Sequence, residues 1–294
     1  MMGCEICGAS GGTFHRVREM MFGMGDEFRY HECQNCGCLS LMDVPNQISR
    51  YYPDGYYSKR EIKTNLFRKL RDSVYLSRFS FLVDWRKRTD LDVIRRCKMR
   101  RQQSILDVGC GSGHLVRDLR DIGYRAEGID PFIAGDIKDV RGTRVSRKNL
   151  DEVRGAYDLL LFRHSLEHMP RQVQVLRSAR KRLRPGGRCV VCIPVVGWAW
   201  RHYGADWVQL DAPRHLFVHT AKSFTLLAET AGFRVNQVVY DSDEFQFWGS
   251  DLYRTGKPLQ GTGPPPRTVL TQLRDRAEAL NRVQDGDSAQ FYLS

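Results

Sequence analysis

An apolar segment that runs directly into a glycine-rich loop constrains the fold of this chain most. Residues 104–108 read Ser-Ile-Leu-Asp-Val, and the loop after them has three glycines at alternate positions: Gly109, Gly111 and Gly113. Glycines let a backbone turn sharply and approach a ligand closely at the start of a helix. Because apolar residues then recur at helical spacing over residues 115–122, the sequence predicts a strand, a ligand-binding loop and a helix.

Two acids flank this loop in the sequence and indicate what it binds. A second apolar segment, residues 126–129, ends at Asp130, which lies 17 residues beyond Gly113. A Rossmann-type fold places a carboxylate at this position to bind ribose hydroxyls. The loop itself reads Asp-x-Gly-x-Gly-x-Gly, and not the Gly-x-Gly-x-x-Gly of dinucleotide-binding folds. The acid before the first glycine, Asp107, suits a cationic or amine-bearing ligand better than a diphosphate.

This pattern resembles motif I of the class I S-adenosylmethionine-dependent methyltransferases. The resemblance continues through residues 129–130, 157–161, 166–168 and 183–188, and it covers roughly Ser104 to Val239. It implies an α/β fold with a Rossmann-like, seven-stranded methyltransferase sheet and helices on both faces. It also implies S-adenosylmethionine as the cofactor.

The resemblance implies a role for each matching residue. The three glycines would form the loop under the cofactor, Asp107 would lie near its amino-acid portion, and Asp130 would bind both ribose hydroxyls. Asn149 or the backbone of Leu150 would contact the adenine, because the acid that often serves there is missing. Arg163 follows the fourth strand, where the family usually contacts the methionine portion.

Two histidines are the candidate catalytic residues. His164 also follows the fourth strand, where the family usually contacts the acceptor. His215 lies in a Pro-x-His-Leu-x-x-x-Thr segment similar to one that borders the acceptor pocket in many members. An imidazole with a pKa near 6.5 suits substrate binding or proton removal, and the alternative is a histidine that hydrogen-bonds the loop. We expect Glu167 and His168 to fix their local loop rather than to catalyse.

Cysteines concentrate at the start of the chain and predict a zinc ribbon. Two Cys-x-x-Cys pairs stand 25 residues apart: Cys4 with Cys7, and Cys33 with Cys36. Each pair is followed by a glycine, and four thiolates complete the tetrahedral shell of a structural zinc ion. A metal would also stabilise a segment too short for a large core. Substitute ligands remain open: Cys38, His15 and His31.

Positive charge concentrates between Lys59 and Arg101. This segment has 15 Lys and Arg against five Asp and Glu, so it supplies +10 of the formal charge of +12. Its apolar residues recur at helical spacing, which predicts one or two amphipathic helices after an aromatic linker at residues 51–57. The helices could bind a phosphate-rich partner or an acidic membrane, or they could simply present a solvated face.

The sequence predicts three regions. They are a zinc-ribbon-like domain at residues 1–50, the linker and basic helices at 51–102, and a methyltransferase domain at 103–294 with an insertion at about 249–285. Within the last region we expect a helix over 221–231 that Thr220 caps and another helix over about 269–283. Strands six and seven are predicted at 233–240 and 288–293, and the seventh should run antiparallel.

The predicted function is transfer of a methyl group from S-adenosylmethionine to a small-molecule acceptor. The combination with a zinc ribbon resembles members that act on a sugar, a glycan precursor or a secondary metabolite. An RNA methyltransferase that uses the basic helices and the ribbon is the first alternative, and a non-catalytic binding module with this fold is the second. No apolar run reaches the roughly 18–20 residues that span a bilayer. The first residues also lack a signal-peptide pattern, so we expect a cytoplasmic protein.

Overall fold

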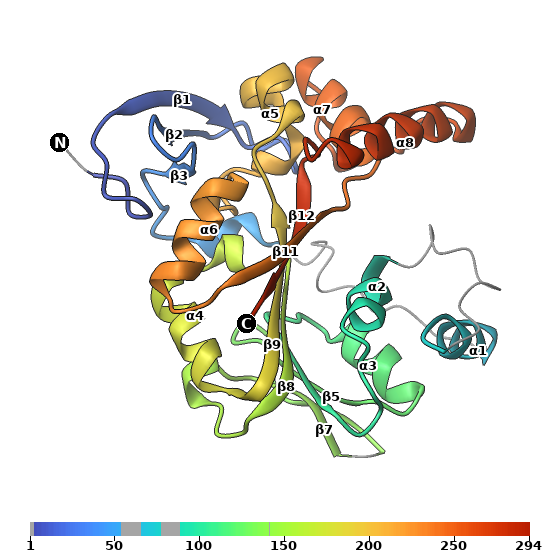
Figure 1. The fold of residues 1–294 in the computed structure, drawn as a ribbon. Coiled ribbons are helices and arrows are strands. Elements are labelled where there is room, and N and C mark those ends of the chain that lie inside the picture. Colours follow the sequence, from blue (N-terminus) through green and yellow to red (C-terminus); the bar gives the residue numbers. More distant parts are fainter. Residues whose placement is uncertain (1–2, 54–65, 78–88, 141) are drawn as a thin grey trace. The chain divides into compact units, whose positions relative to one another are not determined.

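The computed structural model describes residues 3–53, 66–77, 89–140 and 142–294 (Figure 1). Most of the predicted aromatic linker and part of the basic segment lie outside these residues. Two short helices of the basic segment are described, α1 (Leu66–Tyr75) and α2 (Thr89–Arg96). The chain forms two compact units. Unit 1 comprises Met1–Tyr52, Leu166–Gln174 and Cys192–Leu293, and unit 2 comprises Pro53–Ser165, Val175–Val191 and Ser294.

Unit 2 is built around a mainly parallel sheet. Its strands are β4 (Ser104–Val108), β5 (Arg125–Ile129), β6 (Ile137–Asp139), β7 (Gly142–Ser146), β8 (Tyr157–Arg163) and most of β9 (Leu183–Pro194). They follow the order β9-β8-β4-β5-β7-β6, in which β4 runs parallel to β5 and β8 while β6 runs antiparallel to β7. The side chains of residues 159–162 in β8 are fully buried, as a strand covered on both faces requires.

Helices cover both faces of the sheet in unit 2. In Figure 1, α3 (His114–Asp121) lies on one face beside β5, and α4 (Gln172–Lys181) lies on the other. The register sets Val108 opposite both Ile129 and Phe162. The carboxyl ends of three neighbouring strands therefore meet at one edge, where open α/β sheets bind their ligands.

Unit 1 contains a second, antiparallel sheet in the order β1-β2-β3-β10. Its strands are β1 (Gly12–Arg18), β2 (Glu27–Cys33), β3 (Leu39–Leu41) and β10 (Phe217–Val218). Because β3 pairs with β10, the N-terminal segment and residues 199–218 bury their apolar side chains in one core. The N-terminal segment is thus an integral part of unit 1.

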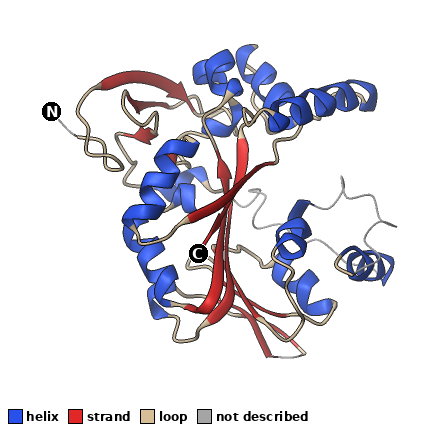
Figure 2. Cartoon of the chain, in the orientation of Figure 1, coloured by secondary structure: helices blue, strands red, loops and turns tan. Residues whose placement is uncertain are grey.

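The rest of unit 1 includes the C-terminal strands and the helices α5 to α8 (Figure 2). These are β11 (Val235–Tyr240), β12 (Ser288–Leu293), α5 (Trp198–Tyr203), α6 (Ala221–Thr230), α7 (Phe245–Arg254) and α8 (Arg267–Arg282). The strand β12 pairs antiparallel with β11, as predicted for strands six and seven. The predicted capped helix corresponds to α6, and the predicted helix over 269–283 corresponds to α8.

The predicted α/β fold class is confirmed, with one addition to the sheet. The seven expected strands are present, and the short edge strand β6 is an eighth. The helix α7 and the two-residue strand β10 were also not predicted. Compact units need not be independently folding domains, so the predicted domain boundaries remain predictions.

Candidate functional site

The glycine-rich loop has the backbone conformation that its sequence predicts. Gly109, Gly111 and Gly113 have φ values of 72°, 55° and 70°, in the left-handed region that side chains disfavour. A Cβ atom on Gly113 would lie 2.3 Å from Cγ2 of Val145, so no larger residue fits there. The backbone N–H groups of Gly109 and Cys110 donate to the carbonyl oxygen of Ile129 over 2.8 and 3.2 Å. The loop is thereby anchored to the end of β5.

The two predicted acids lie at neighbouring strand ends. Asp107 is the fourth residue of β4, and Asp130 follows the last residue of β5. Both side chains are at least nine-tenths buried. The carboxylate of Asp130 accepts N–H hydrogen bonds from Gly111 over 2.9 Å and from Phe132 over 2.8 Å. Each of its oxygens has a further lone pair that can accept a hydroxyl proton, which fits the predicted ribose contact.

The other predicted cofactor residues occupy the same unit. Asn149 is exposed and caps a short 3-10 helix, Leu150–Glu152, in which Glu152 accepts the N–H of Asn149 over 2.7 Å. Arg163 is the last residue of β8, and the exposed His164 follows it with a φ of 48°. A left-handed conformation is uncommon for a residue other than glycine and often marks a functional position.

His215 belongs to unit 1 and is buried. Its side chain is 4% exposed, and its Nδ1 lies 2.8 Å from the carbonyl oxygen of Gln209. Burial, together with the nearby His168, lowers the pKa of His215 to about 4. The ring is therefore neutral at neutral pH, and the hydrogen bond to Gln209 matches the alternative prediction that His215 bonds its own loop.

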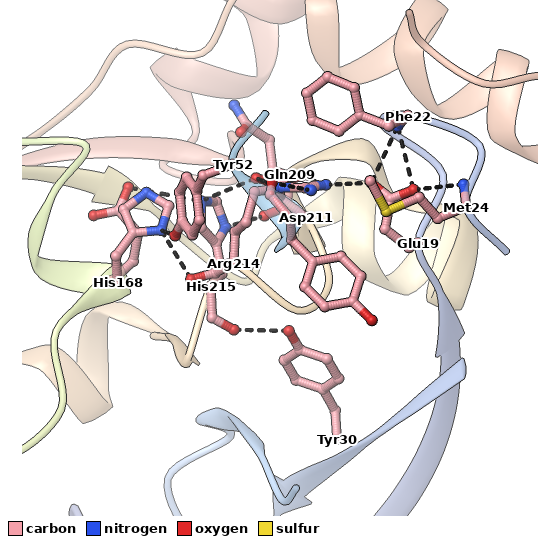
Figure 3. A network of polar contacts seen from close by, with 12 residues as sticks. Glu19, Phe22, Met24, Tyr30, Tyr52, His168, Gln209, Asp211, Arg214 and His215 are labelled. Atoms are coloured by element: carbon pink, nitrogen blue, oxygen red, sulfur yellow. Dashed lines mark hydrogen bonds and ion pairs between the residues drawn. The ribbon is translucent and has the colours of Figure 1, made fainter. Parts of the chain in front are cut away.

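A buried ion network holds the loop that carries His215 (Figure 3). Arg214 is fully buried and donates to Glu19 over 2.8 Å and to Asp211 over 2.7 Å. Glu19 also accepts the backbone N–H groups of Phe22 and Met24 over 3.1 and 3.0 Å. Although burial acts to lower it, the pKa of Arg214 is raised by these two carboxylates, so the guanidinium remains charged.

Tyr30 ties the N-terminal sheet to the same loop. Its hydroxyl donates to the carbonyl oxygen of His215 over 2.7 Å, and Arg214 donates to the carbonyl oxygen of Tyr51 over 3.0 Å. The sequence did not predict this network, because Glu19 and Arg214 are 195 residues apart. No local motif marks either residue as one half of a pair.

The structure brings Glu167 and His168 next to His215. Each of the three residues offers one ligand atom, and these atoms lie within 4.8 Å of one another. The His168 and His215 rings have centroids 4.7 Å apart. Both short motifs can be recognised in the sequence, but the chain between them gives no sign that they meet.

The four predicted zinc ligands are also gathered in unit 1. The sulfur atoms of Cys4, Cys7, Cys33 and Cys36 all lie within 4.8 Å of one another. Two sulfur pairs are closer, Cys4 with Cys36 at 3.7 Å and Cys7 with Cys33 at 3.6 Å. In a tetrahedral site with Zn–S bonds of about 2.3 Å, neighbouring sulfurs are about 3.8 Å apart. The cluster therefore fits a four-thiolate zinc site and is too open for disulfides.

The three candidate substitute ligands lie elsewhere among the described contacts. The Cys38 sulfur lies 3.8 Å from Nδ1 of His219. His15 pairs with Glu32 over 2.8 Å, and the His31 ring packs on Phe14 at a centroid distance of 5.2 Å. The geometry thus favours the four cysteines as the complete ligand set.

The loop and the two acids lie at adjacent parallel strand ends, which gives unit 2 the arrangement of a Rossmann-like α/β domain. A family model described as "Methyltransferase domain" matches residues 67–238, which is more than half of the chain. The chain therefore belongs to this methyltransferase family, which confirms the family predicted from the motifs.

Two curated relatives are ubiquinone biosynthesis O-methyltransferases. The protein from Shewanella halifaxensis is 31% identical over 101 residues, which cover 29% of this chain and 41% of the relative. The protein from Nitrosococcus oceani is 29% identical over 109 residues, which cover 33% and 46%. The matches thus span less than half the length of these two relatives.

Two solved structures are similar to this chain. A SAM dependent methyltransferase from Archaeoglobus fulgidus has a TM-score of 0.44 and 15% identity, covering 73% of this chain and 96% of that chain. The 1,6-didemethyltoxoflavin-N1-methyltransferase of Burkholderia thailandensis has a TM-score of 0.44 and 13% identity, covering 90% and 94%. Among the described residues, no helix combines the length and the apolar character needed to cross a membrane.

Proposed function

We propose that this chain transfers a methyl group from S-adenosylmethionine to a hydroxyl oxygen of a small molecule. The observation that carries the proposal is the loop geometry. Three glycines with positive φ lie against the end of β5, where Asp130 accepts the N–H of Gly111. This arrangement suits a nucleoside with a positively charged tail, because it combines a close backbone approach with two carboxylates.

The chain's residues would bind and align this cofactor. Asp130 would bind the ribose hydroxyls, Asp107 the amino-acid portion, and Asn149 or the Leu150 backbone the adenine. Arg163 would contact the methionine portion. A sulfonium makes its methyl carbon electrophilic, so the protein mainly has to align the two reactants and exclude water.

The acceptor part of the proposal combines the relatives and the motifs. The names of the curated relatives suggest oxygen as the methylated atom. A sugar, a glycan precursor or a secondary metabolite remains the predicted acceptor class. This prediction rests on the resemblance to family members that also carry an N-terminal zinc ribbon. His215 of unit 1 and His164 of unit 2 each remain a predicted acceptor-side residue. The Nδ1 of His215 is bonded to Gln209, which leaves Nε2 as its functional atom.

We further propose a structural zinc ion on the four cysteines. A shell of four thiolates leaves no position for a substrate, so the ion would stabilise the fold rather than react. Burial raises the pKa of Cys4, and a bound divalent cation would offset that cost by stabilising the thiolate.

The test of cofactor binding is the Asp130→Ala variant. We expect it to bind S-adenosylmethionine at least about 100-fold more weakly by calorimetry, because two hydrogen bonds to a charged group are lost. Asp275→Ala, which removes an exposed acid on α8, is the matched control and should bind as the parent chain does.

An unchanged affinity in Asp130→Ala, with circular dichroism like that of the parent chain, would overturn the cofactor assignment. The acceptor is then sought by incubating the chain and S-adenosylmethionine with metabolite pools. A product heavier by one CH₂ group that forms only with the cofactor would identify it.

A further inference from the structure

We propose that Glu167, His168 and His215 bind a divalent transition-metal ion, at a site separate from the four cysteines. All three residues belong to unit 1. Glu167 and His168 lie in the 3-10 helix Leu166–His168, and His215 lies in the segment after Asp211. Their ligand atoms lie within 4.8 Å of one another. Two imidazoles and a carboxylate form one of the common metal-binding sets in proteins.

The hydrogen bonds of both histidines fix which nitrogen can bind a metal. Nδ1 of His168 lies 2.8 Å from the carbonyl oxygen of Arg214, and Nδ1 of His215 lies 2.8 Å from that of Gln209. A carbonyl oxygen can only accept, so each Nδ1 carries the hydrogen and each Nε2 keeps its lone pair. Metal-binding histidines usually have this arrangement, in which a backbone carbonyl orients the ring and fixes its tautomer.

Negative and electron-rich atoms converge on Nε2 of His215. It lies 3.9 Å from Oε1 of Glu167 and 3.9 Å from Oδ2 of Asp211. Because this Nε2 carries no hydrogen, it cannot donate to either carboxylate. Glu167 and His215 are only 1% and 4% exposed. A cation between the lone pair and the Glu167 carboxylate would turn this repulsive arrangement into an attractive one.

Asp211 remains outside the proposed ligand set, since both of its oxygens accept from Arg214. The three ligand atoms lie within 4.8 Å of one another and would have to move closer together to bind one ion. Bonds of about 2.0–2.2 Å place neighbouring ligand atoms about 3–3.5 Å apart. Binding would therefore bring Glu167 and His215 closer by several tenths of an ångström, which side-chain rotations can supply.

The ligand types select the class of metal. Imidazole nitrogens suit zinc, iron, cobalt and nickel, whereas magnesium and calcium prefer shells made of oxygen. Three protein ligands leave positions open for water or for an oxygen of a substrate. If the proposed function holds, an acceptor hydroxyl bound there would lose its proton to solvent more readily. His215 would then act as a metal ligand rather than as the base.

Cobalt(II) titration of the metal-stripped, full-length chain tests this proposal. Cobalt bound to thiolates gives intense charge-transfer absorption, and cobalt bound to histidine and carboxylate gives only weak bands. We expect one equivalent of cobalt without thiolate absorption in the parent chain. Glu167→Gln and His168→Gln should each lose this equivalent, while any thiolate absorption stays unchanged.

His202→Gln is the matched control, because His202 is an exposed histidine of the same unit that stacks on Trp198. It should keep the non-thiolate equivalent. The proposal is wrong if the parent chain binds no cobalt outside the thiolates, or if Glu167→Gln retains it. Calorimetry measures S-adenosylmethionine binding independently of the number of cobalt ions bound. A failure of the metal proposal is therefore distinguishable from a failure of the proposed function.

Discussion

At the scale of single residues, Asp287 links the stability of unit 1 to pH. Its side chain is 1% exposed, and Nε1 of Trp207 donates to it over 3.0 Å. Burial raises the pKa of Asp287 to about 7, although the hydrogen bond from Trp207 acts against this. An unfolded chain releases the same proton near pH 3.9. The contribution of Asp287 therefore favours folding at low pH and is lost as the pH rises through about 7.

Asp287→Asn should remove this dependence, because an amide is uncharged and its oxygen can still accept from Trp207. We expect the variant to be more stable than the parent chain at pH 8, with the advantage shrinking by about 2 kcal/mol as the pH falls to 5. Urea unfolding at several pH values measures the difference. Asp285→Asn, which alters a partly exposed pair with Arg201, is the control. A constant difference between Asp287→Asn and the parent chain would contradict the assignment.

Residues in spaced motifs could be predicted from the sequence, and residues that act through distant partners could not. The three glycines of residues 109–113 and the cysteines of each Cys-x-x-Cys pair stand at short intervals that fix their geometry locally. Arg214 and Asp287 gave no such signal. Their hydrogen-bond partners, Glu19 and Trp207, are distant in the sequence, and only the folded chain brings those partners to them.

At the scale of elements, Thr220 connects α6 to a cysteine turn. Its Oγ1 accepts the N–H of Ser223 over 2.9 Å, which confirms the predicted N-cap. The same hydroxyl donates to the carbonyl oxygen of Cys36 over 2.7 Å. One side chain thus starts a helix and also holds the second Cys-x-x-Cys pair in place.

Thr220→Ala should lower the free energy of unfolding by about 1–2 kcal/mol, because the helix loses its cap. Thr220→Ser keeps the oxygen and should stay within about 0.5 kcal/mol of the parent chain. Chemical denaturation of the three proteins gives the comparison. Equal losses in both variants would show that packing of the methyl group, rather than the hydroxyl, matters.

The elements that the sequence missed are short or lack a clear period. The strands β6 and β10 have three and two residues, too few for an alternating pattern. They exist because β7 and β3 offer pairing partners. The helix α7 begins only five residues after the end of β11, and no predicted helix covers it.

At the scale of the whole molecule, the predicted zinc ribbon shares its core with distant parts of the chain. The strand β3 pairs with β10, and the N–H of Leu41 donates to the carbonyl oxygen of Leu216 over 2.9 Å. Loss of the metal should therefore destabilise residues beyond the N-terminal segment. Metal binding and folding energy are coupled in such sites.

Cys4→Ser should release the zinc, as elemental analysis would show, and should speed amide hydrogen exchange in β3, β10 and the start of α6. Cys38→Ser is the matched control, because Cys38 lies outside the cluster and should leave the metal in place. If faster exchange is confined to residues 3–52, the N-terminal segment is an independent module, and the shared core contributes little to its stability.

The Arg214–Glu19 pair sets a limit on how this chain can be recombined. A chimera that exchanges the first 52 residues replaces the carboxylate that meets a fully buried guanidinium. Without Glu19, Arg214 would keep its pair with Asp211 but would lose one acceptor of a buried charged group, which costs about 1–3 kcal/mol. A donor segment must therefore supply an acid at position 19 as well as four cysteines. A chimera that keeps this acid should therefore be more stable than one that lacks it.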